Sequence, residues 1–164
     1  MQMQRADATA IDINGPSVLV DRFSPPYSIY GGLSWDWALN EIQKGLESGR
    51  VETKPNGGYV VNGMTPNDFF MDQAIHWLQS YDHNKVVRMQ MYVAITIHAH
   101  LFSQHSDPGQ RSLVIQGAGN TAVDVNGKVA VLEPGDLMFL NGDEPHRFTS
   151  LGPRFSITLS LEDE

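Results

Sequence analysis

The sequence predicts a mainly β protein of the α+β kind, a double-stranded β-helix (jelly roll) buttressed by two N-terminal helices. Two observations predict this fold. From residue 86 onward, short runs of apolar and β-branched residues alternate with turn residues, and Asn126-Gly127 is the strongest hairpin signal among them. The first half of the chain contains two segments with helical periodicity instead. About eight strands are enough for a double-layered barrel with a site inside its mouth.

The predicted jelly-roll core covers residues 86–162. A long strand runs from Val86 to His100, and a short extended piece carries His105. The remaining strands, separated by turn residues, are Ser112–Gln116, Thr121–Val125, Lys128–Leu132, Leu137–Leu140 and Arg147–Leu161, the last broken near Gly152-Pro153.

Residues 1–85 are predicted to buttress and cover this core within one domain of 164 residues. Ser34 is a suitable N-cap for a helix that ends at Gly49. The apolar stripe of that helix consists of Trp35, Leu39, Ile42 and Leu46.

Three further segments complete the first half of the chain. A second helix begins at Thr65, which is followed by a proline in the first turn, and runs to about Ser80. The residues from Val51 to Asn62 predict a hairpin. The segment 24–32, rich in tyrosine and glycine, predicts a surface loop, and a lid over the barrel mouth is the alternative.

Composition excludes several classes of function. The net charge of -8, without a stripe of lysine and arginine, disfavours a nucleic-acid partner. The absence of cysteine excludes disulfides and thiolate zinc sites. No apolar run has membrane-spanning length and Met1–Asp12 is polar, so we expect a soluble cytoplasmic protein without a membrane partner. Exposed edge strands leave a homodimer open.

The tripeptide His105-Ser106-Asp107 is the main candidate for chemistry. Residues i and i+2 of an extended segment point to the same side, so His105 and Asp107 can bind one cation together. The stretch from Leu132 to His146 predicts strand, Pro-Gly turn, strand, polar turn and histidine, which returns the chain to the same point. Two imidazoles and one carboxylate leave coordination positions open, as in non-haem Fe(II) sites. We therefore predict a metal site at His105, Asp107 and His146.

Three stretches resemble the cupin-like and JmjC-type Fe(II)/2-oxoglutarate oxygenases. They match an F-x-x-H-x-D motif, an apolar strand ending in Gln-x-Gly, and an L-x-P-G-D motif followed by a closing Pro-His, and they are Leu101–Asp107, Leu113–Gly119 and Leu132–His146. The resemblance implies a cupin-type barrel with Fe(II) and 2-oxoglutarate as cofactors. It also implies hydroxylation of a peptide side chain or small molecule, with decarboxylation of 2-oxoglutarate to succinate.

In these oxygenases a basic residue holds the far carboxylate of 2-oxoglutarate. Arg154-Phe155-Ser156 fits this role, because the planar guanidinium binds a carboxylate with two hydrogen bonds and Ser156 points to the same side. In several JmjC-type hydroxylases the basic residue follows the Gln-x-Gly-x-Gly stretch instead, where this chain has Asn120 and Thr121. The cosubstrate assignment therefore rests on Arg154.

The two faces of the long strand that begins at Val86 differ in polarity. Its odd-numbered residues, such as Met89 and Met91, are apolar and predict a core face. Its even-numbered residues predict contacts with cosubstrate (Thr96) and substrate (Tyr92, His98, His100), although an exposed polar face is an alternative.

Two other assignments remain open at this stage. An alternative metal site uses His98 and His100, with Gln104 in the place where many cupins have a glutamate. The functional alternatives are a metal-binding small-molecule cupin, an isomerase or dioxygenase that does not use 2-oxoglutarate, and a non-catalytic cupin-fold binding or structural module.

Overall fold

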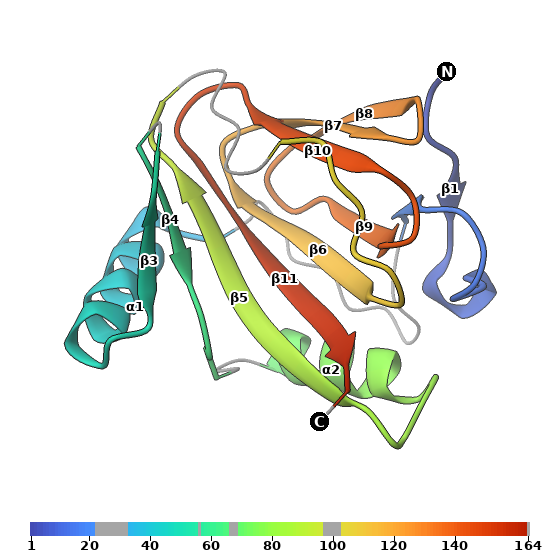
Figure 1. Cartoon of the computed structure of the whole chain (residues 1–164), viewed down its shortest axis with the longest axis horizontal. Coiled ribbons are helices and arrows are strands. Elements are labelled where there is room, and N and C mark those ends of the chain that lie inside the picture. The colour runs from blue at the N-terminus through green and yellow to red at the C-terminus, as the bar shows by residue number, and fades with distance from the viewer. Residues whose placement is uncertain (22–32, 56, 66–68, 97–102, 164) are drawn as a thin grey trace.

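Two facing β-sheets form the body of the protein (Figure 1). The structure is a computed structural model, and it describes residues 1–21, 33–55, 57–65, 69–96 and 103–163. An eight-stranded sheet has the order β1-β2-β9-β6-β11-β5-β4-β3, and a three-stranded sheet has the order β10-β7-β8. The strands are β1 (Arg5–Ala6), β2 (Val18–Val20), β3 (Val51–Lys54), β4 (Gly58–Val61), β5 (Val86–Ala94), β6 (Arg111–Ala118), β7 (Thr121–Val125), β8 (Lys128–Leu132), β9 (Leu137–Asn141), β10 (His146–Ser150) and β11 (Arg154–Glu162). The helices are the single 3-10 turn η1 (Ala8–Ala10), α1 (Trp35–Glu47) and α2 (Phe69–Gln79).

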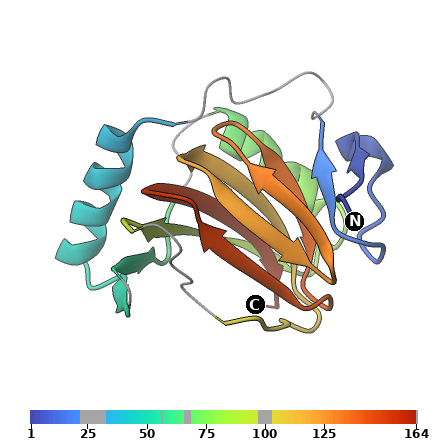
Figure 2. The ribbon, with the colours of Figure 1, turned by 90° about the horizontal axis from the view of Figure 1, so that it is seen from above.

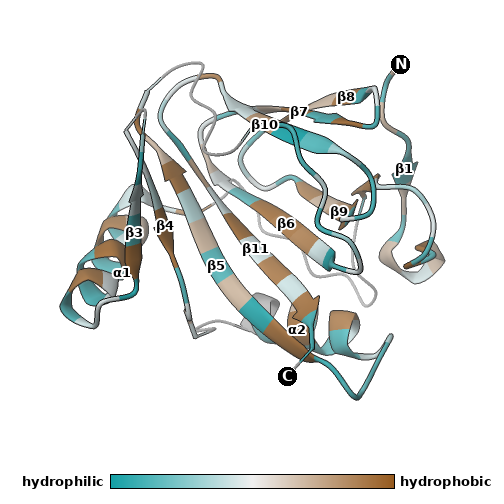
Figure 3. Cartoon of the chain, in the orientation of Figure 1, coloured by the Kyte–Doolittle hydropathy of each residue, from teal (hydrophilic) through white to brown (hydrophobic). Residues whose placement is uncertain are grey.

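Strand β11 is the centre of the large sheet, because it pairs antiparallel with both β5 and β6. Ser156 lies opposite Tyr92 of β5 and Gln116 of β6. The two-residue period of a strand therefore gives the three strands a common even-numbered face and a common odd-numbered face. The alternating teal and brown segments of β5 and β11 in Figure 3 display this division.

The odd-numbered face packs against the helices and is the main apolar core. Helix α2 lies on the side of the large sheet that faces away from the small sheet (Figures 1 and 2). The core residues contributed by the three central strands are Met89, Met91, Val93, Leu113, Ile115, Ala118, Phe155, Ile157, Leu159 and Leu161. The sequence-based prediction of a core face for the odd-numbered residues of β5 is confirmed.

Helix α1 has the predicted N-cap but not the predicted rotation. The side chain of Ser34 accepts a hydrogen bond of 3.1 Å from the backbone N–H of Trp37. Leu39 and Leu46, predicted to be buried, are 58% and 61% exposed, so that part of the stripe was wrong. The helix turns its small residues to the sheet instead: a Cβ at Gly45 would lie only 2.8 Å from a methyl group of Val51. Such close backbone approach sets the rotation of the helix.

The long predicted strand is shorter than its apolar pattern suggests. Strand β5 ends at Ala94, which pairs with Gly58 and Arg154, the first residues of β4 and β11. The N–H of Ile95 still donates to the carbonyl of Gly57 at 3.3 Å. Because β4 and β11 both begin opposite Ala94, the ladder does not continue through Ile95, so the predicted extension there was wrong. The remainder of the predicted extension, residues 97–100, lies outside the described residues.

Other boundaries differ in smaller ways. The second helix is described from Phe69, since residues 66–68 lie outside the described ranges. The candidate lid, residues 24–32, also lies outside them. The sequence did not predict β1 and β2, whose short runs join the large sheet through β9. No helix in the described ranges is long and apolar enough to cross a membrane.

The register of β11 is fixed by a bulge at Gly117. Phe155 pairs with Ala118 and Ser156 with Gln116, so Gly117 is the extra residue of β6. A Cβ at Gly117 would lie 2.1 Å from the ring of Phe155, which is fully buried. Only glycine leaves room for this ring.

We therefore expect Gly117→Ala to destabilise the protein by about 1–3 kcal/mol through overpacking. Urea unfolding of the wild type, Gly117→Ala, Phe155→Leu and the double variant measures this effect. The smaller leucine should make room for the added methyl group, so the double variant should lose less stability than the two single variants together. Strictly additive losses would contradict the proposed contact.

Candidate metal centre

A cavity of about 370 Å³ lies between the two sheets, at the small end of the range for small-molecule sites. The even-numbered face of the large sheet forms one wall, and the small sheet with the loop before β6 forms the other. The polar residues of these walls are Gln90, Tyr92, Ser112, Arg154, Ser156, Thr158, Ser160 and Glu162 on the large sheet, with His105, Asp107, Gln110, Thr121 and His146 opposite or beside them.

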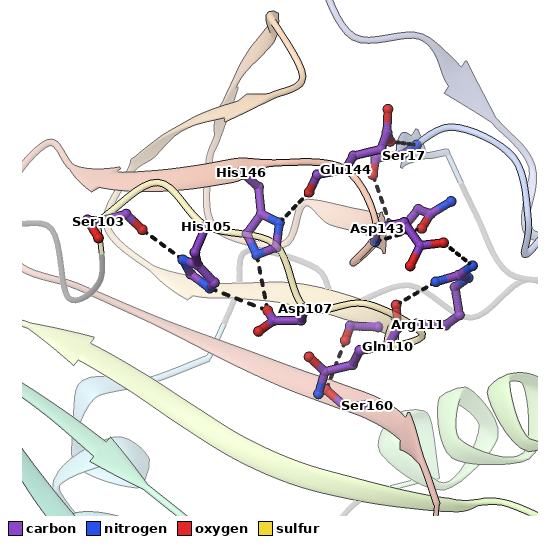
Figure 4. A network of polar contacts seen from close by, with 12 residues as sticks. Ser17, Ser103, His105, Asp107, Gln110, Arg111, Asp143, Glu144, His146 and Ser160 are labelled. Atoms are coloured by element: carbon purple, nitrogen blue, oxygen red, sulfur yellow. Dashed lines mark hydrogen bonds and ion pairs between the residues drawn. The ribbon is translucent and has the colours of Figure 1, made fainter.

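The predicted ligands His105, Asp107 and His146 converge at this cavity (Figure 4). Oδ2 of Asp107 lies 3.3 Å from Nε2 of His105 and 3.3 Å from Nε2 of His146. One potential ligand atom from each residue lies within 4.8 Å of the others. Two ligand atoms at right angles around a metal, each about 2.1 Å from it, lie about 3.0 Å apart. The spacing of the donor atoms therefore fits neighbouring positions around one ion.

The hydrogen bonds of the two imidazoles fix which nitrogen faces the site. Nδ1 of His105 donates to the carbonyl of Ser103 at 2.7 Å, and Nδ1 of His146 donates to the carbonyl of Glu144 at 2.8 Å. Because a carbonyl oxygen can only accept, each neutral ring carries its lone pair on Nε2. Two imidazole lone pairs and a carboxylate oxygen then face one another, and the hydrogen bonds of the described residues place no donor between them. A cation relieves this repulsion, so the donor set fits a metal ion.

Backbone pairing brings the three ligands together. His105 and His146 form an isolated antiparallel bridge, with N–H to carbonyl distances of 3.1 and 2.8 Å. The N–H of Asp107 donates to the carbonyl of Gly142 at 2.8 Å. A side chain at Gly142 would lie 2.5 Å from the carbonyl of Asp107, so this close approach requires glycine. The short piece that carries His105 is thus tied to the turn that precedes His146.

That turn is clamped by Glu144. Its half-buried carboxylate accepts the backbone N–H of Ser17 at 2.6 Å and faces the ammonium of Lys128 at 3.2 Å. Burial would raise the pKa of Glu144, but the hydrogen bonds from Ser17 and the charge of Lys128 outweigh it and hold the pKa below its usual value. Since the carbonyl of Glu144 orients His146, this clamp supports the metal site.

Arg154 is a buried cation at the other end of the cavity. It is 2% exposed, its Nε donates to Ser150 at 3.0 Å, and its Nη1 donates to Ser156 at 3.1 Å. Burial lowers the pKa of Arg154 to about 10, which leaves it charged at neutral pH. No carboxylate pairs with it among the residues that the structure describes. An anion entering the cavity would supply the missing countercharge.

A short hydrogen-bond chain holds the groups around Arg154. Ser156 donates to Oε1 of Gln116 at 2.7 Å, and Nε2 of Gln116 donates to Thr121 at 3.0 Å. Gln116 is fully buried. Thr121 also lines the cavity. It stands where the resemblance to JmjC-type enzymes would place a basic residue, and it provides no charge there.

The remaining predicted site residues have different locations. Tyr92 lines the cavity and donates to Gln90 at 2.9 Å; burial raises its pKa to about 12, and the carboxylate of Asp107 adds to this. Thr96 is exposed, lies beyond the end of β5 and is not part of the cavity wall. His98 and His100 lie outside the described residues, and Gln104 is exposed. Ligand contacts by Tyr92, Thr96, His98 and His100 stay predictions.

Sequence reasoning missed part of the cavity wall. Ser112, Thr158 and Ser160 line it, yet none was a candidate. The signal was present in the alternation of polar and apolar residues from Arg154 to Glu162. Such alternation alone does not distinguish a cavity wall from a face exposed to water.

Comparison with known proteins agrees with this architecture. A profile of the AraC-like ligand binding domain family matches residues 92–163. YcfD, a ribosomal oxygenase from Escherichia coli, superposes with a TM-score of 0.70 at 13% identity, covering 100% of this chain and 53% of YcfD. The chain therefore spans about half the length of that protein.

Two more solved structures are similar. YcfD in complex with cobalt and 2-oxoglutarate matches with a TM-score of 0.55 at 14% identity, over 68% of this chain and 34% of that one. KdgF from Halomonas sp. matches with a TM-score of 0.51 at 14% identity, over 70% of this chain and 86% of KdgF. No curated protein matches the sequence.

The chain has a cupin-type jelly-roll fold. Identities this low show a shared fold and leave the reaction to be argued from the site itself. In this cupin-type barrel the three candidate ligands lie in the part of the chain that the family profile covers.

We expect Asp107→Asn to abolish metal binding, because an amide removes the negative charge on which both Nε2 atoms converge. Differential scanning calorimetry with Mn(II) as the probe measures this. At a concentration 100-fold above Kd, Mn(II) should stabilise the wild type by about 2.7 kcal/mol and the variant by almost nothing. Asp163→Asn, at an exposed carboxylate that does not line the cavity, is the control and should respond as the wild type does.

We expect Lys128→Met to weaken Mn(II) binding by about tenfold without unfolding the protein, because it loosens the turn that orients His146. Lys44→Met on helix α1 changes the charge equally and should have no effect. Competition with a fluorescent chelator gives the affinities. Equal affinities in both variants would show that the Glu144 clamp does not support the metal site.

Proposed function

We propose that this chain is an Fe(II)- and 2-oxoglutarate-dependent oxygenase that hydroxylates a small molecule or a peptide side chain. The observation that carries the proposal is the presence, in one cavity, of three potential metal ligands and a buried arginine without a carboxylate partner in the described residues. A 2-oxo acid with a second carboxylate complements both. One end chelates a metal, and the other end pairs with a guanidinium.

Each residue has a definite part in this proposal. His105, Asp107 and His146 would hold Fe(II), and the Nδ1–H bonds orient the imidazoles with Nε2 toward the ion. Arg154 and Ser156 would hold the far carboxylate. Bound Fe(II) supplies the activation of dioxygen, coupled to decarboxylation of 2-oxoglutarate to succinate.

The small cavity and the fold support this assignment. A volume of about 370 Å³ accommodates a cosubstrate and a substrate portion of similar size, and no more. The structure of YcfD, a protein of the same fold, contains cobalt and 2-oxoglutarate. That complex makes a dicarboxylate next to a metal a reasonable ligand for a barrel of this kind.

A metal-binding cupin that does not use 2-oxoglutarate is the second candidate. The match to KdgF covers 70% of this chain and 86% of KdgF, so a chain not much longer than the matched region carries a similar fold. In this alternative Arg154 would pair with a carboxylate of the substrate itself. A non-catalytic module would use the cavity, like the AraC-like domain, for ligand binding alone.

The decisive experiment is an anaerobic titration of 2-oxoglutarate into the Fe(II)-loaded protein, followed by visible spectroscopy. We expect the weak charge-transfer band of a chelated 2-oxo acid in the wild type. Arg154→Ala should bind Fe(II) normally but require at least tenfold more 2-oxoglutarate, since a charge-assisted bidentate pair is lost. Arg147→Ala, which removes an exposed arginine from β10, is the matched control and should titrate like the wild type.

Two results would reject the oxygenase proposal. Bound Fe(II) with no band at saturating 2-oxoglutarate would favour the cupin that acts without this cosubstrate. A protein that binds neither Fe(II) nor Mn(II) would favour the non-catalytic module.

A further inference from the structure

The cavity has a second polar region, separate from the groups around Arg154. Along β11 the cavity wall passes from Arg154, which is 2% exposed, to Glu162, whose side chain is 31% exposed. The side chain of Asp107 is 42% exposed. Solvent therefore reaches the cavity at the Glu162 end. We call the wall at this end, formed by Ser112, Thr158 and Ser160, the hydroxyl wall.

The hydroxyl wall lies beside the metal ligands. Gln110 donates through its side chain to Glu162 at 2.7 Å, and its backbone N–H donates to the carbonyl of Asp107 at 3.0 Å. The loop that carries Asp107 therefore passes over the C-terminal end of β11. Figure 4 shows Asp107, Gln110 and Ser160 in this arrangement. A molecule on the hydroxyl wall would be next to the candidate metal centre and away from Arg154.

The hydroxyl groups of this wall do not use all of their hydrogen-bonding capacity within the protein. Ser112 and Ser160 are 3% and 2% exposed, and their hydroxyl oxygens lie 2.9 Å apart. This pair uses only one of its two O–H donors. The hydroxyl of Thr158 has no protein partner in the described parts of the chain, where every buried side-chain polar atom is satisfied. The cavity must therefore reach the Thr158 hydroxyl.

The charges around the wall disfavour an ionic ligand. Glu162 already pairs with Nε of Arg88 at 3.0 Å and accepts from Gln110, so it provides no unpaired anion for a cationic ligand. An anionic ligand would face the carboxylates of Asp107 and Glu162. The groups left over are neutral, and a hydroxyl both donates and accepts. A ligand hydroxyl, which also does both, complements them.

We propose that the hydroxyl wall is the substrate subsite and that it binds a neutral, polyhydroxylated small molecule of polyol or monosaccharide size. The inference rests on the proposed function in one respect, since it takes the adjacent metal centre as the reacting centre. The small cavity favours such a compact molecule over a macromolecular segment.

Calorimetric titration of the Mn(II)-loaded protein tests the subsite. The probes are xylitol and D-ribose, with a pentane diol carrying only terminal hydroxyls as the less hydroxylated control. Glutarate and cadaverine are the anionic and cationic controls. We expect xylitol or D-ribose to bind at least tenfold more tightly than the diol and cadaverine. Glutarate binding should depend on Arg154 and not on the hydroxyl wall.

Two variants locate the binding. Thr158→Val is isosteric, and Ser112→Ala with Ser160→Ala removes both members of a hydrogen-bonded pair, so each should fold. Each should weaken polyol binding by about five- to tenfold, while the affinity for 2-oxoglutarate stays unchanged. Thr53→Val, at an exposed threonine on β3, should leave polyol binding unchanged.

The proposal is overturned if neither polyol binds, if the diol or cadaverine binds as tightly, or if Thr158→Val and Thr53→Val behave alike. Its failure is distinct from failure of the proposed function. Polyol binding without a 2-oxoglutarate band would support the subsite and reject the oxygenase. A band without polyol binding would support the oxygenase and overturn the subsite.

Discussion

Strand β11 has the helices on one side of its sheet and the small sheet on the other, and the site depends on which of its residues faces which side. Its odd-numbered side chains pack under the helices, and its even-numbered side chains face the small sheet. A shift by one residue would exchange these faces and place Arg154 in the apolar core. The ring of Phe155, 5.1 Å from that of Trp35 and 6.0 Å from that of Trp37, prevents this shift together with the bulge at Gly117. The apolar packing on one side of the strand thereby orients the polar groups on the other side toward the cavity.

The polar face of the large sheet lowers the stability of the folded protein. A buried guanidinium with no carboxylate partner in the described residues raises the free energy of the folded protein, and so does the convergence of acceptor atoms at the three candidate ligands. These two unfavourable features have opposite sign and lie in the same cavity. A cation would relieve one and an anion the other. Groups arranged in this way are typical of binding sites rather than of structural polar clusters, because their stability depends on what binds between them.

Sequence reasoning succeeded where the signal was local and failed where it depended on distant partners. The HxD motif, the Pro-Gly and Asn-Gly turns and the Ser34 cap are encoded by neighbouring residues. The rotation of α1 depends on Gly45 meeting Val51, and the end of β5 depends on where its neighbours begin. The polar alternation of β11 is visible in the sequence, yet only the small sheet opposite turns that face into a cavity wall.

The candidate metal centre also depends on residues that no metal-site motif contains. His146 is oriented by the carbonyl of Glu144, whose carboxylate is held by Ser17 and Lys128. The hydroxyl of Ser17 in turn accepts the N–H of Asn141, at the start of the same turn. Ser17 directly precedes the short strand β2, which joins the large sheet only through β9 and β1. The N-terminal segment therefore supports the candidate metal centre, because it holds both ends of the turn that presents the third candidate ligand.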